Sequence, residues 1–266
     1  MIANMPGQSP QSIYQLSAKQ TEGAEVTPIK ANSWRLEIPA GPSGKYRLAQ
    51  LDDYTHCFRR QMHWQAPLTM ELSARASDHI NPGTWGFGLW NDPFSFSMGF
   101  GGGARRFPAL PNTTWFFFAA AQNHLSLYDN QPAHGNLAGI IQSPSLPTCA
   151  LLPGMILLPF LLIPPAARLF RRMARRLIRQ ETVRFNADLT QWHHYKLVWE
   201  TRGVRFLLDN ATLFESARAP STPLGLVIWI DNQFLAWTAD GRFDYGYLET
   251  VRPAWIEIKD FQIESL

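Results

Sequence analysis

Short runs of alternating apolar and polar residues make up most of this chain, and they predict β-strands. Turn residues bound the runs, for example Asn81-Pro-Gly83 and Asp240-Gly241. The runs predict strands at 33–39, 45–51, 69–76, 84–90, 94–100, 113–121, 124–129, 182–189, 195–200, 204–209, 213–216, 225–231 and 255–263. Many short strands at close spacing are typical of a β-sandwich or barrel. We therefore expect an all-β fold.

One segment, 143–181, interrupts this pattern. It contains an uncharged apolar run at 149–163 with several prolines, followed by arginines at 168, 171, 172, 175, 176 and 179. Spacings of three and four residues place these arginines on one face of a single α-helix, with the apolar residues between them on the other face. The prolines argue against a straight transmembrane helix across 146–166. We expect an inserted apolar hairpin followed by a basic amphipathic helix.

An apolar stretch beside a basic amphipathic helix is typical of proteins that bind an anionic membrane surface. We therefore expect peripheral or monotopic membrane association. The predicted contact residues are Leu152, Ile156, Phe160, Leu161, Arg168, Phe170, Arg171, Arg172, Arg175, Arg176, Leu177 and Arg179. Two alternatives stay open: a helix packed on the domain with a solvated arginine face, and contact with an acidic protein or a nucleic-acid phosphate.

Length and charge narrow the organisation further. The predicted units are an N-terminal arm or edge strand (1–32), one domain formed by 33–142 and 182–266, and the insertion (143–181). The net charge is +3, and the six arginines of 168–179 leave −3 on the rest, so we expect no nucleic-acid partner. The N-terminus lacks a basic and apolar signal pattern, which favours a cytoplasmic location. The two cysteines, Cys57 and Cys149, are either two buried thiols or one disulfide bridge, and the sequence does not decide between them.

Three segments resemble family 16 glycoside hydrolases and their laminarinase-like relatives. In 191–210, Trp192, His194, Tyr195, Trp199, Phe206 and Asp209 fit a strand pair of that family. The runs 83–90 and 255–263 are similar to its Gly-x-Trp strand and its closing strand. The resemblance implies a concanavalin A-like jelly roll of two antiparallel sheets over about residues 30–142 and 182–266. Jelly rolls of this kind can hold a structural Ca²⁺, for which Asp260 is a conceivable ligand.

The catalytic motif of that family is absent. Its members carry Glu-x-Asp-x-x-Glu on one strand, which aims the carboxylates into the cleft. The corresponding strand here, 112–122, has no carboxylate and carries Trp115 followed by three phenylalanines. Retaining hydrolysis by that mechanism is therefore not expected. An aromatic cleft implies an apolar or amphipathic small molecule as ligand, although an all-apolar strand can also be plain core.

Two aspartates are the candidate proton donors. Asp231 ends an apolar strand beside Trp229, where desolvation raises a carboxyl pKa. Asp129 is the second candidate, and either residue could instead serve a turn. The predicted ligand-binding residues are Trp85, Trp90, Trp115, Trp229, Gln233, Glu71, Tyr54 and His134, of which Glu71 is as well explained by solvent exposure. The histidines show no zinc-like spacing, and we expect no cofactor.

These features predict a membrane-surface enzyme that acts on an apolar or lipid-linked, terpenoid-like substrate by acid-initiated cyclisation or isomerisation. The first alternative is a non-catalytic module that binds carbohydrate or lipid. The second is a divergent glycoside hydrolase with its carboxylates rearranged onto other strands.

Overall fold

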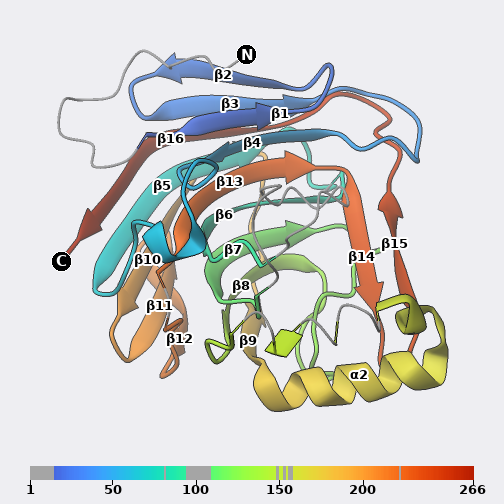
Figure 1. The fold of residues 1–266 in the computed structure, drawn as a ribbon. Helices are drawn as coiled ribbons and strands as arrows, with labels where there is room; N and C mark the ends of the chain where they lie inside the picture. The colour runs from blue at the N-terminus through green and yellow to red at the C-terminus, as the bar shows by residue number, and fades with distance from the viewer. Residues whose placement is uncertain are drawn as a thin grey trace.

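The computed structural model describes residues 15–80, 82–93, 109–147, 150–151, 154, 158–221 and 223–266. Two seven-stranded antiparallel sheets stack face to face, as Figure 1 shows. This arrangement is the jelly-roll sandwich that the sequence predicts. The described helices are η1 (Arg59–Gln61), η2 (Leu158–Leu162) and α2 (Pro164–Leu177).

Sheet A contains, in spatial order, β1 (Ser17–Gln20), β4 (Leu48–Asp52), β13 (Gly225–Asp231), β6 (Thr84–Trp90), β7 (Thr113–Ala119), β8 (Gly135–Gln142) and β9 (Arg179–Arg184). Sheet B contains β12 (Ala211–Ser216), β11 (Gly203–Leu208), β10 (His193–Glu200), β5 (Leu68–Ala76), β16 (Ala254–Ser265), β3 (Ser33–Ile38) and β2 (Glu25–Lys30). A separate hairpin pairs β14 (Gln233–Trp237) with β15 (Phe243–Tyr247).

The main core lies between the two sheets, and strand alternation selects its members. On β5 every second residue, from Leu68 to Ala76, is buried and faces sheet A, while the residues between them are half-buried on the other side. Such alternation is expected of a sheet with one face in the core and one near solvent. The β10–β11 pair likewise sends Tyr195, Trp199 and Phe206 into this core.

Sheet A differs from sheet B because its central strands are buried on both faces. All seven residues of β6 and all seven of β13 are buried. The face turned away from sheet B carries a second, smaller hydrophobic cluster, covered partly by Tyr54 and Met62 from the segment between β4 and β5. We call this face of sheet A, opposite the core, the outer face. The outer face therefore has a buried layer of its own, formed by side chains of sheet A and of the segment between β4 and β5.

Several predicted strands need correction. Residues 124–129 form a loop with one bridge, His124 to Ala236, because this segment packs beside β14 instead of joining sheet A. Strand β8 and the β14–β15 hairpin were not predicted. The predicted strand at 94–100 lies outside the described residues.

The helix of the insertion ends earlier than the arginine spacing predicts. Helix α2 stops at Leu177, and Arg179 begins β9 at the edge of sheet A. Five of the six arginines are therefore helical, and the placement of Arg179 on the helix is wrong. Ladder hydrogen bonds to β8, with Gln142 opposite Arg179, take the chain into the sheet at this point.

Candidate functional site

Aromatic side chains gather on the outer face of sheet A. Strand register places Trp229 opposite Gly86, Gly86 opposite Phe117, and Trp115 opposite Gly88. The ring centroids of Trp115 lie 5.5 Å from Trp229 and 5.0 Å from Phe117. These separations are typical of packed aromatic pairs. The central strands thus present a continuous aromatic surface.

Glycine at two positions of β6 makes this surface possible. A Cβ on Gly86 would lie 2.7 Å from the Trp229 ring, and a Cβ on Gly88 would lie 2.5 Å from Cβ of Trp115. Both values are far below ordinary van der Waals contact. Gly86 therefore leaves room for the Trp229 ring close against the strand, and Gly88 allows the neighbouring strand to approach closely at Trp115.

Asp231 borders the aromatic surface at the end of β13. Its Oδ1 accepts hydrogen bonds from Thr84 Oγ1 at 2.8 Å and from the backbone nitrogens of Thr84 and Gln233 at 3.2 and 3.1 Å. The Thr84 hydroxyl in turn accepts from Trp229 Nε1 at 3.0 Å. Desolvation is the main cause that raises the pKa of Asp231 to about 7, against the lowering effect of these donors. This carboxyl can carry a proton near neutral pH.

Tyr46 and Gln233 complete this end of the site. A side-chain hydrogen bond joins Tyr46 to Asp231, and burial followed by the Asp231 charge raises the pKa of the Tyr46 hydroxyl. Gln233 is buried, and its Nε2 has no hydrogen-bond partner among the described residues. A buried amide donor without a partner needs an explanation, and a bound ligand would supply one.

A second polar group lies at the other end of the aromatic surface. Asp52 is fully buried on β4, and its oxygens accept from Gln50 Nε2 and Thr55 Oγ1, both at 2.8 Å, and from the Thr55 backbone nitrogen. Lys19, on the neighbouring β1, has its pKa lowered chiefly by desolvation, while Asp52 opposes that shift. The acceptor capacity of Asp52 is thus largely used within the fold.

The two outer-face carboxylates are too far apart for paired-acid hydrolysis. Asp52 lies opposite Val227, which is four residues from Asp231 on the same strand. At about 3.3 Å per residue this is roughly 13 Å along the sheet. Glycosidase carboxylates lie about 5–9.5 Å apart. Asp52 therefore lies too far from Asp231 to serve as its partner in that mechanism.

Several predicted ligand-binding residues do lie on the outer face. Trp90, Trp229 and Tyr54 are buried in its cluster, and Trp115 packs on the cluster while half-buried. The backbone nitrogen of Gln233 donates to Asp231 at the edge of this face. The structure therefore brings four of the predicted residues to one surface with Gln233 next to it in the chain, and their ligand-binding role stays a prediction.

Trp85 and Glu71 do not lie on the outer face, contrary to their predicted place in the aromatic cleft. Trp85 points into the core between the sheets, where it stacks on Phe118 with ring centroids 3.6 Å apart. Glu71 lies on β5 in sheet B, where it pairs with Lys196 at 3.0 Å. Trp85 points away from the aromatic surface because alternate residues of a strand face opposite sides. Glu71 lies away from it because its strand belongs to sheet B.

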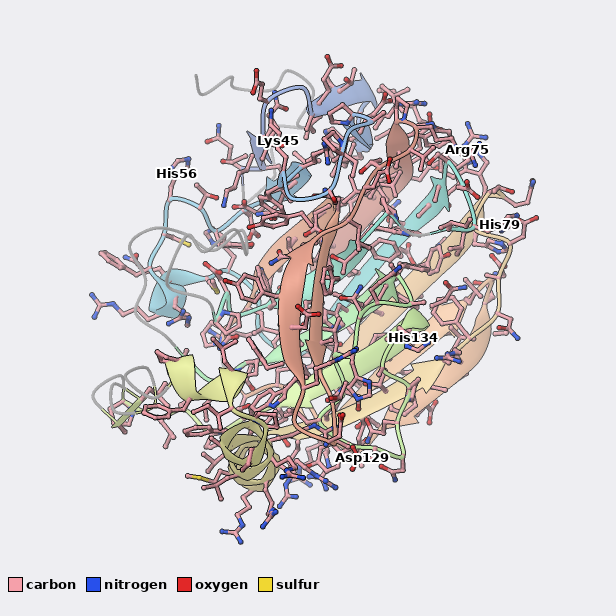
Figure 2. The ribbon with its side chains drawn as sticks, turned by 90° about the vertical axis from the view of Figure 1, so that its right-hand side faces the viewer. Lys45, His56, Arg75, His79, Asp129 and His134 are labelled. Atoms are coloured by element: carbon pink, nitrogen blue, oxygen red, sulfur yellow. The ribbon has the colours of Figure 1, made fainter. Side chains whose placement is uncertain are left out.

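Asp129 and His134 both lie in the β7–β8 connection, and Figure 2 shows Asp129 at the level of α2 and His134 nearer the middle of the molecule. Asp129 is half-exposed, and its two oxygens meet the guanidinium groups of Arg171 at 2.7 Å and Arg175 at 3.4 Å. Its contacts indicate an anchor for α2, and they do not support a role as proton donor. His134 is half-buried, and its Nδ1 has no hydrogen-bond partner within the described part of the chain.

The predicted membrane-contact residues divide into several groups. Arg168, Arg172, Arg176, Leu177 and Phe160 are exposed, as is Arg179 on β9. Phe170 and Arg175 are half-buried. Leu161 and Arg171 are buried, so their predicted contact with a membrane is wrong. Leu152 and Ile156 lie outside the described residues.

Sequence reasoning missed three outer-face residues, Tyr46, Gln50 and Thr84, and it did not separate Phe117 from the phenylalanines on either side of it. Gln50 and Thr84 have the same strand parity as Trp229 and Asp231 once the strands are paired, a signal that depends on knowing the register. Phe117 shares its parity with Trp115, two positions away, so alternation alone could have separated it from Phe116 and Phe118.

Among the described residues, no group of three or more His, Cys, Asp or Glu side chains is placed to hold a metal ion. Within the same residues no helix has the length and apolar character needed to cross a bilayer. The suggested Ca²⁺ ligand, Asp260, forms an ion pair with Lys30 at 3.2 Å, and its metal role stays a prediction.

Comparisons with known proteins give similarities to solved structures only. No family model matches the chain, and no curated protein matches it. Similar solved structures include an endo-acting O-glycanase of the human gut microbiota, from work on mucin breakdown (10% identity, TM-score 0.48, covering 100% of this chain and 98% of that one). Others are a legume lectin-like domain from Entamoeba histolytica (7%, 0.47, 94% and 90%) and a family 16 glycosyl hydrolase from Mycobacterium smegmatis (12%, 0.45, 99% and 99%). All three TM-scores lie below 0.5 and all three identities are 12% or less, so the jelly-roll sandwich is established by the two stacked sheets themselves.

Proposed function

We propose that the outer face of sheet A binds a carbohydrate, as a non-catalytic recognition site. The observation that carries this proposal is the aromatic surface of Trp90, Trp115 and Trp229, which ends at Asp231 and the unpartnered amide of Gln233. Binding sites typically combine a mainly apolar lining with a few placed polar groups. A sugar ring matches that combination, because it has apolar C–H faces and a rim of hydroxyl groups.

Trp115 is the most exposed of the three tryptophans. Trp90 and Trp229 are 9% and 7% exposed, and Asp231 is buried, while Trp115 is half-buried. In this proposal a ligand therefore contacts Trp115 first. The sequence resemblance of the strand pair at 191–210 to a family of carbohydrate-active proteins motivates the choice of a carbohydrate, and the arrangement of rings and polar groups is compatible with it.

The test is a glycan array followed by calorimetry on any glycan that binds. Trp115→Ala should abolish binding, and Trp192→Ala is the matched control. Trp192 is also a half-buried tryptophan, but it lies beside sheet B, under Arg75 and Lys259. Silence of the wild-type protein on all glycans, or equal loss in both variants, would refute the proposal.

A second candidate is divergent glycoside hydrolysis with Asp231 as general acid. The observation in its favour is the Asp231 pKa of about 7, which keeps part of the population protonated at neutral pH. The roughly 13 Å to Asp52 weighs against it. Asp231→Asn should abolish sugar release while sparing sugar binding, whereas the binding proposal predicts no release from the wild-type protein either.

Cyclisation or isomerisation of a lipid-linked substrate needs the same acid in the same place. Neither the fold nor the contacts of Asp231 distinguish a lipid-linked substrate from a carbohydrate. This chemistry stays a prediction from the sequence, and incubation with polyprenyl substrates tests it directly.

A further inference from the structure

Exposed apolar side chains are concentrated at one end of the described molecule. Among the described residues thirteen large apolar side chains are exposed, and six of them fall within the eighteen positions from Phe160 to Leu177. They are Phe160 (48% exposed), Leu162 (70%), Ile163 (49%), Leu169 (53%), Met173 (51%) and Leu177 (44%). Scattered exposed apolar residues are ordinary, whereas a contiguous group indicates an interaction surface.

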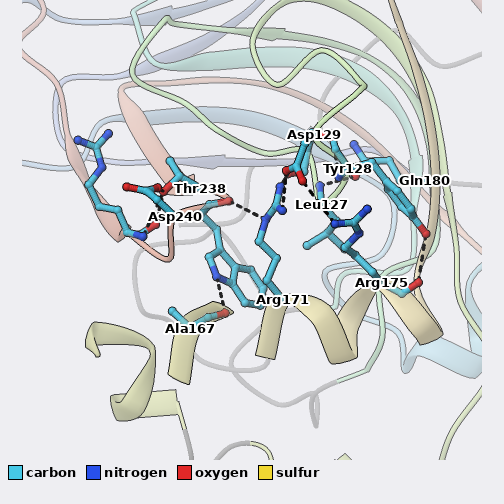
Figure 3. Close-up of polar contacts among 12 residues, drawn as sticks. Leu127, Tyr128, Asp129, Ala167, Arg171, Arg175, Gln180, Thr238 and Asp240 are labelled. Carbon is cyan, nitrogen blue, oxygen red and sulfur yellow. Dashed lines mark hydrogen bonds and ion pairs between the residues drawn. The ribbon is translucent and has the colours of Figure 1, made fainter. Parts of the chain in front are cut away.

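The rotation of α2 about its axis is fixed by Arg171, as Figure 3 shows. This buried guanidinium donates to the carbonyl oxygens of Ser126 at 2.9 Å and Trp237 at 3.2 Å and pairs with Asp129 at 2.7 Å. The Trp237 indole donates back to the Ala167 carbonyl at 3.2 Å. The helix face that contains Ala167 and Arg171 therefore faces the protein.

This rotation leaves two parallel rows on the outside of α2. Leu169, Met173 and Leu177 form an apolar row, and Arg168, Arg172 and Arg176 form a basic row beside it. Residues four apart lie one above the other on a helix, and the two rows are about 100° apart around the axis. No described carboxylate pairs with the three arginines of the basic row. We call the two rows, with Phe160, Leu162 and Ile163, the α2 ridge.

We propose that the α2 ridge docks the protein onto an anionic lipid surface. The apolar row enters the boundary between headgroups and acyl chains, and the basic row lies at the level of the phosphates. Charge complementarity selects this occupant, because three adjacent guanidinium groups without acidic neighbours favour a surface of many phosphates. A symmetric pairing of two copies through the ridge would bring six guanidinium groups together, which disfavours a dimer. This inference is independent of the proposed carbohydrate site.

Vesicle flotation tests the proposal. The full chain should float with phosphatidylcholine vesicles that contain about one-third phosphatidylserine, should stay behind with pure phosphatidylcholine, and should lose binding as salt is added. The combined Arg168→Gln, Arg172→Gln and Arg176→Gln variant should lose about a hundredfold in partition coefficient, from about fivefold per arginine. The combined Leu169→Gln, Met173→Gln and Leu177→Gln variant should also fail to float.

The matched control removes the same charge elsewhere. Arg60, Arg202 and Arg205 are exposed and lie outside the ridge, so replacing all three by glutamine should leave flotation nearly unchanged. No flotation of the wild-type chain, or equal loss in this control, would overturn the proposal. A dimer in light scattering that Leu169→Gln dissociates would also overturn it, because the ridge would then be a contact between copies.

A second measurement does not depend on loss of binding. Leu169→Trp places an indole on the ridge, and Ile29→Trp places one on β2, at the far end of the molecule (Figure 1). Brominated phosphatidylserine vesicles should quench the fluorescence added by Leu169→Trp and leave that of Ile29→Trp unquenched. Equal quenching of the two, or none of either, would contradict docking through the ridge.

Discussion

Replacement of Arg171 by methionine should release α2 from the sandwich. Methionine keeps the length and much of the apolar stem of the side chain but removes every donor. The carbonyl oxygens of Ser126 and Trp237 then lose charged hydrogen bonds, each worth about 1.5–3 kcal/mol. The pair with half-exposed Asp129 adds only about 0–1 kcal/mol. Relief of the desolvation of a buried charge offsets part of this sum.

The net expected loss is about 3 kcal/mol in the free energy of unfolding. For a domain of this size, that corresponds to about 6–12 °C in Tm. Urea denaturation followed by tryptophan fluorescence measures the global effect. Amide hydrogen exchange over 164–177 measures the local one, and we expect faster exchange there than in the sheets.

Arg175→Met is the control, because Arg175 lies on the same helix and pairs with the same carboxylate. It is half-exposed and 3.4 Å from Asp129, so its loss should cost less than about 1 kcal/mol. Asp129→Asn should cost equally little, since the two carbonyl contacts of Arg171 survive. A loss below about 1 kcal/mol in Arg171→Met, with unchanged exchange in α2, would show that this guanidinium does not fix the helix.

Three further predictions concern sheet A. The pKa of Asp231 is raised from 3.8 to about 7, so the native state binds this proton more tightly than the unfolded state does. The free energy of unfolding should therefore fall as the pH rises between these two values, by up to about 1.4 kcal/mol per pH unit. Asp231→Asn should reduce that slope in urea titrations from pH 4 to 8, and an unchanged slope contradicts the assignment. Trp85→Ala should cost about 3–5 kcal/mol as a core cavity, whereas Trp115→Ala should cost about 1 kcal/mol, which thermal melts distinguish. Gly86→Ala should destabilise by about 1–3 kcal/mol and shift the Trp229 fluorescence, because its Cβ lies 2.7 Å from that ring.

The sandwich was predictable because sheet B faces the core on one side only. On β5 and β10 one face is buried and the other is partly wet, so hydrophobicity alternates along the strand. Strand β8 escaped prediction because Leu137, Ala138 and Ile140 are buried on both faces, so its sequence does not alternate. The β14–β15 hairpin was missed as well, and it owes its place to contacts with α2 and the β7–β8 connection.

The candidate site was predictable in part. Trp229 and Asp231 are two residues apart on a strand, so their common face follows from period-two geometry. The same geometry separates Trp85 from Trp90, which are five residues apart and must point to opposite faces of β6. The orientation of Arg171 could not be predicted, because the carbonyls that it meets come from segments 45 and 66 residues away along the chain.

The run from Gly225 to Trp237 links the two ends of this molecule. Its first part, β13, carries Trp229 and Asp231, and its second part, β14, ends on Trp237, whose carbonyl and indole both bond to α2. Thirteen residues of extended chain therefore join the aromatic surface to the helix, with a single residue, Asn232, between the two strands. The strand that carries Trp229 and Asp231 is thus continuous in sequence with the strand that holds α2, and a displacement of the helix would act on the end of β13 through the backbone alone.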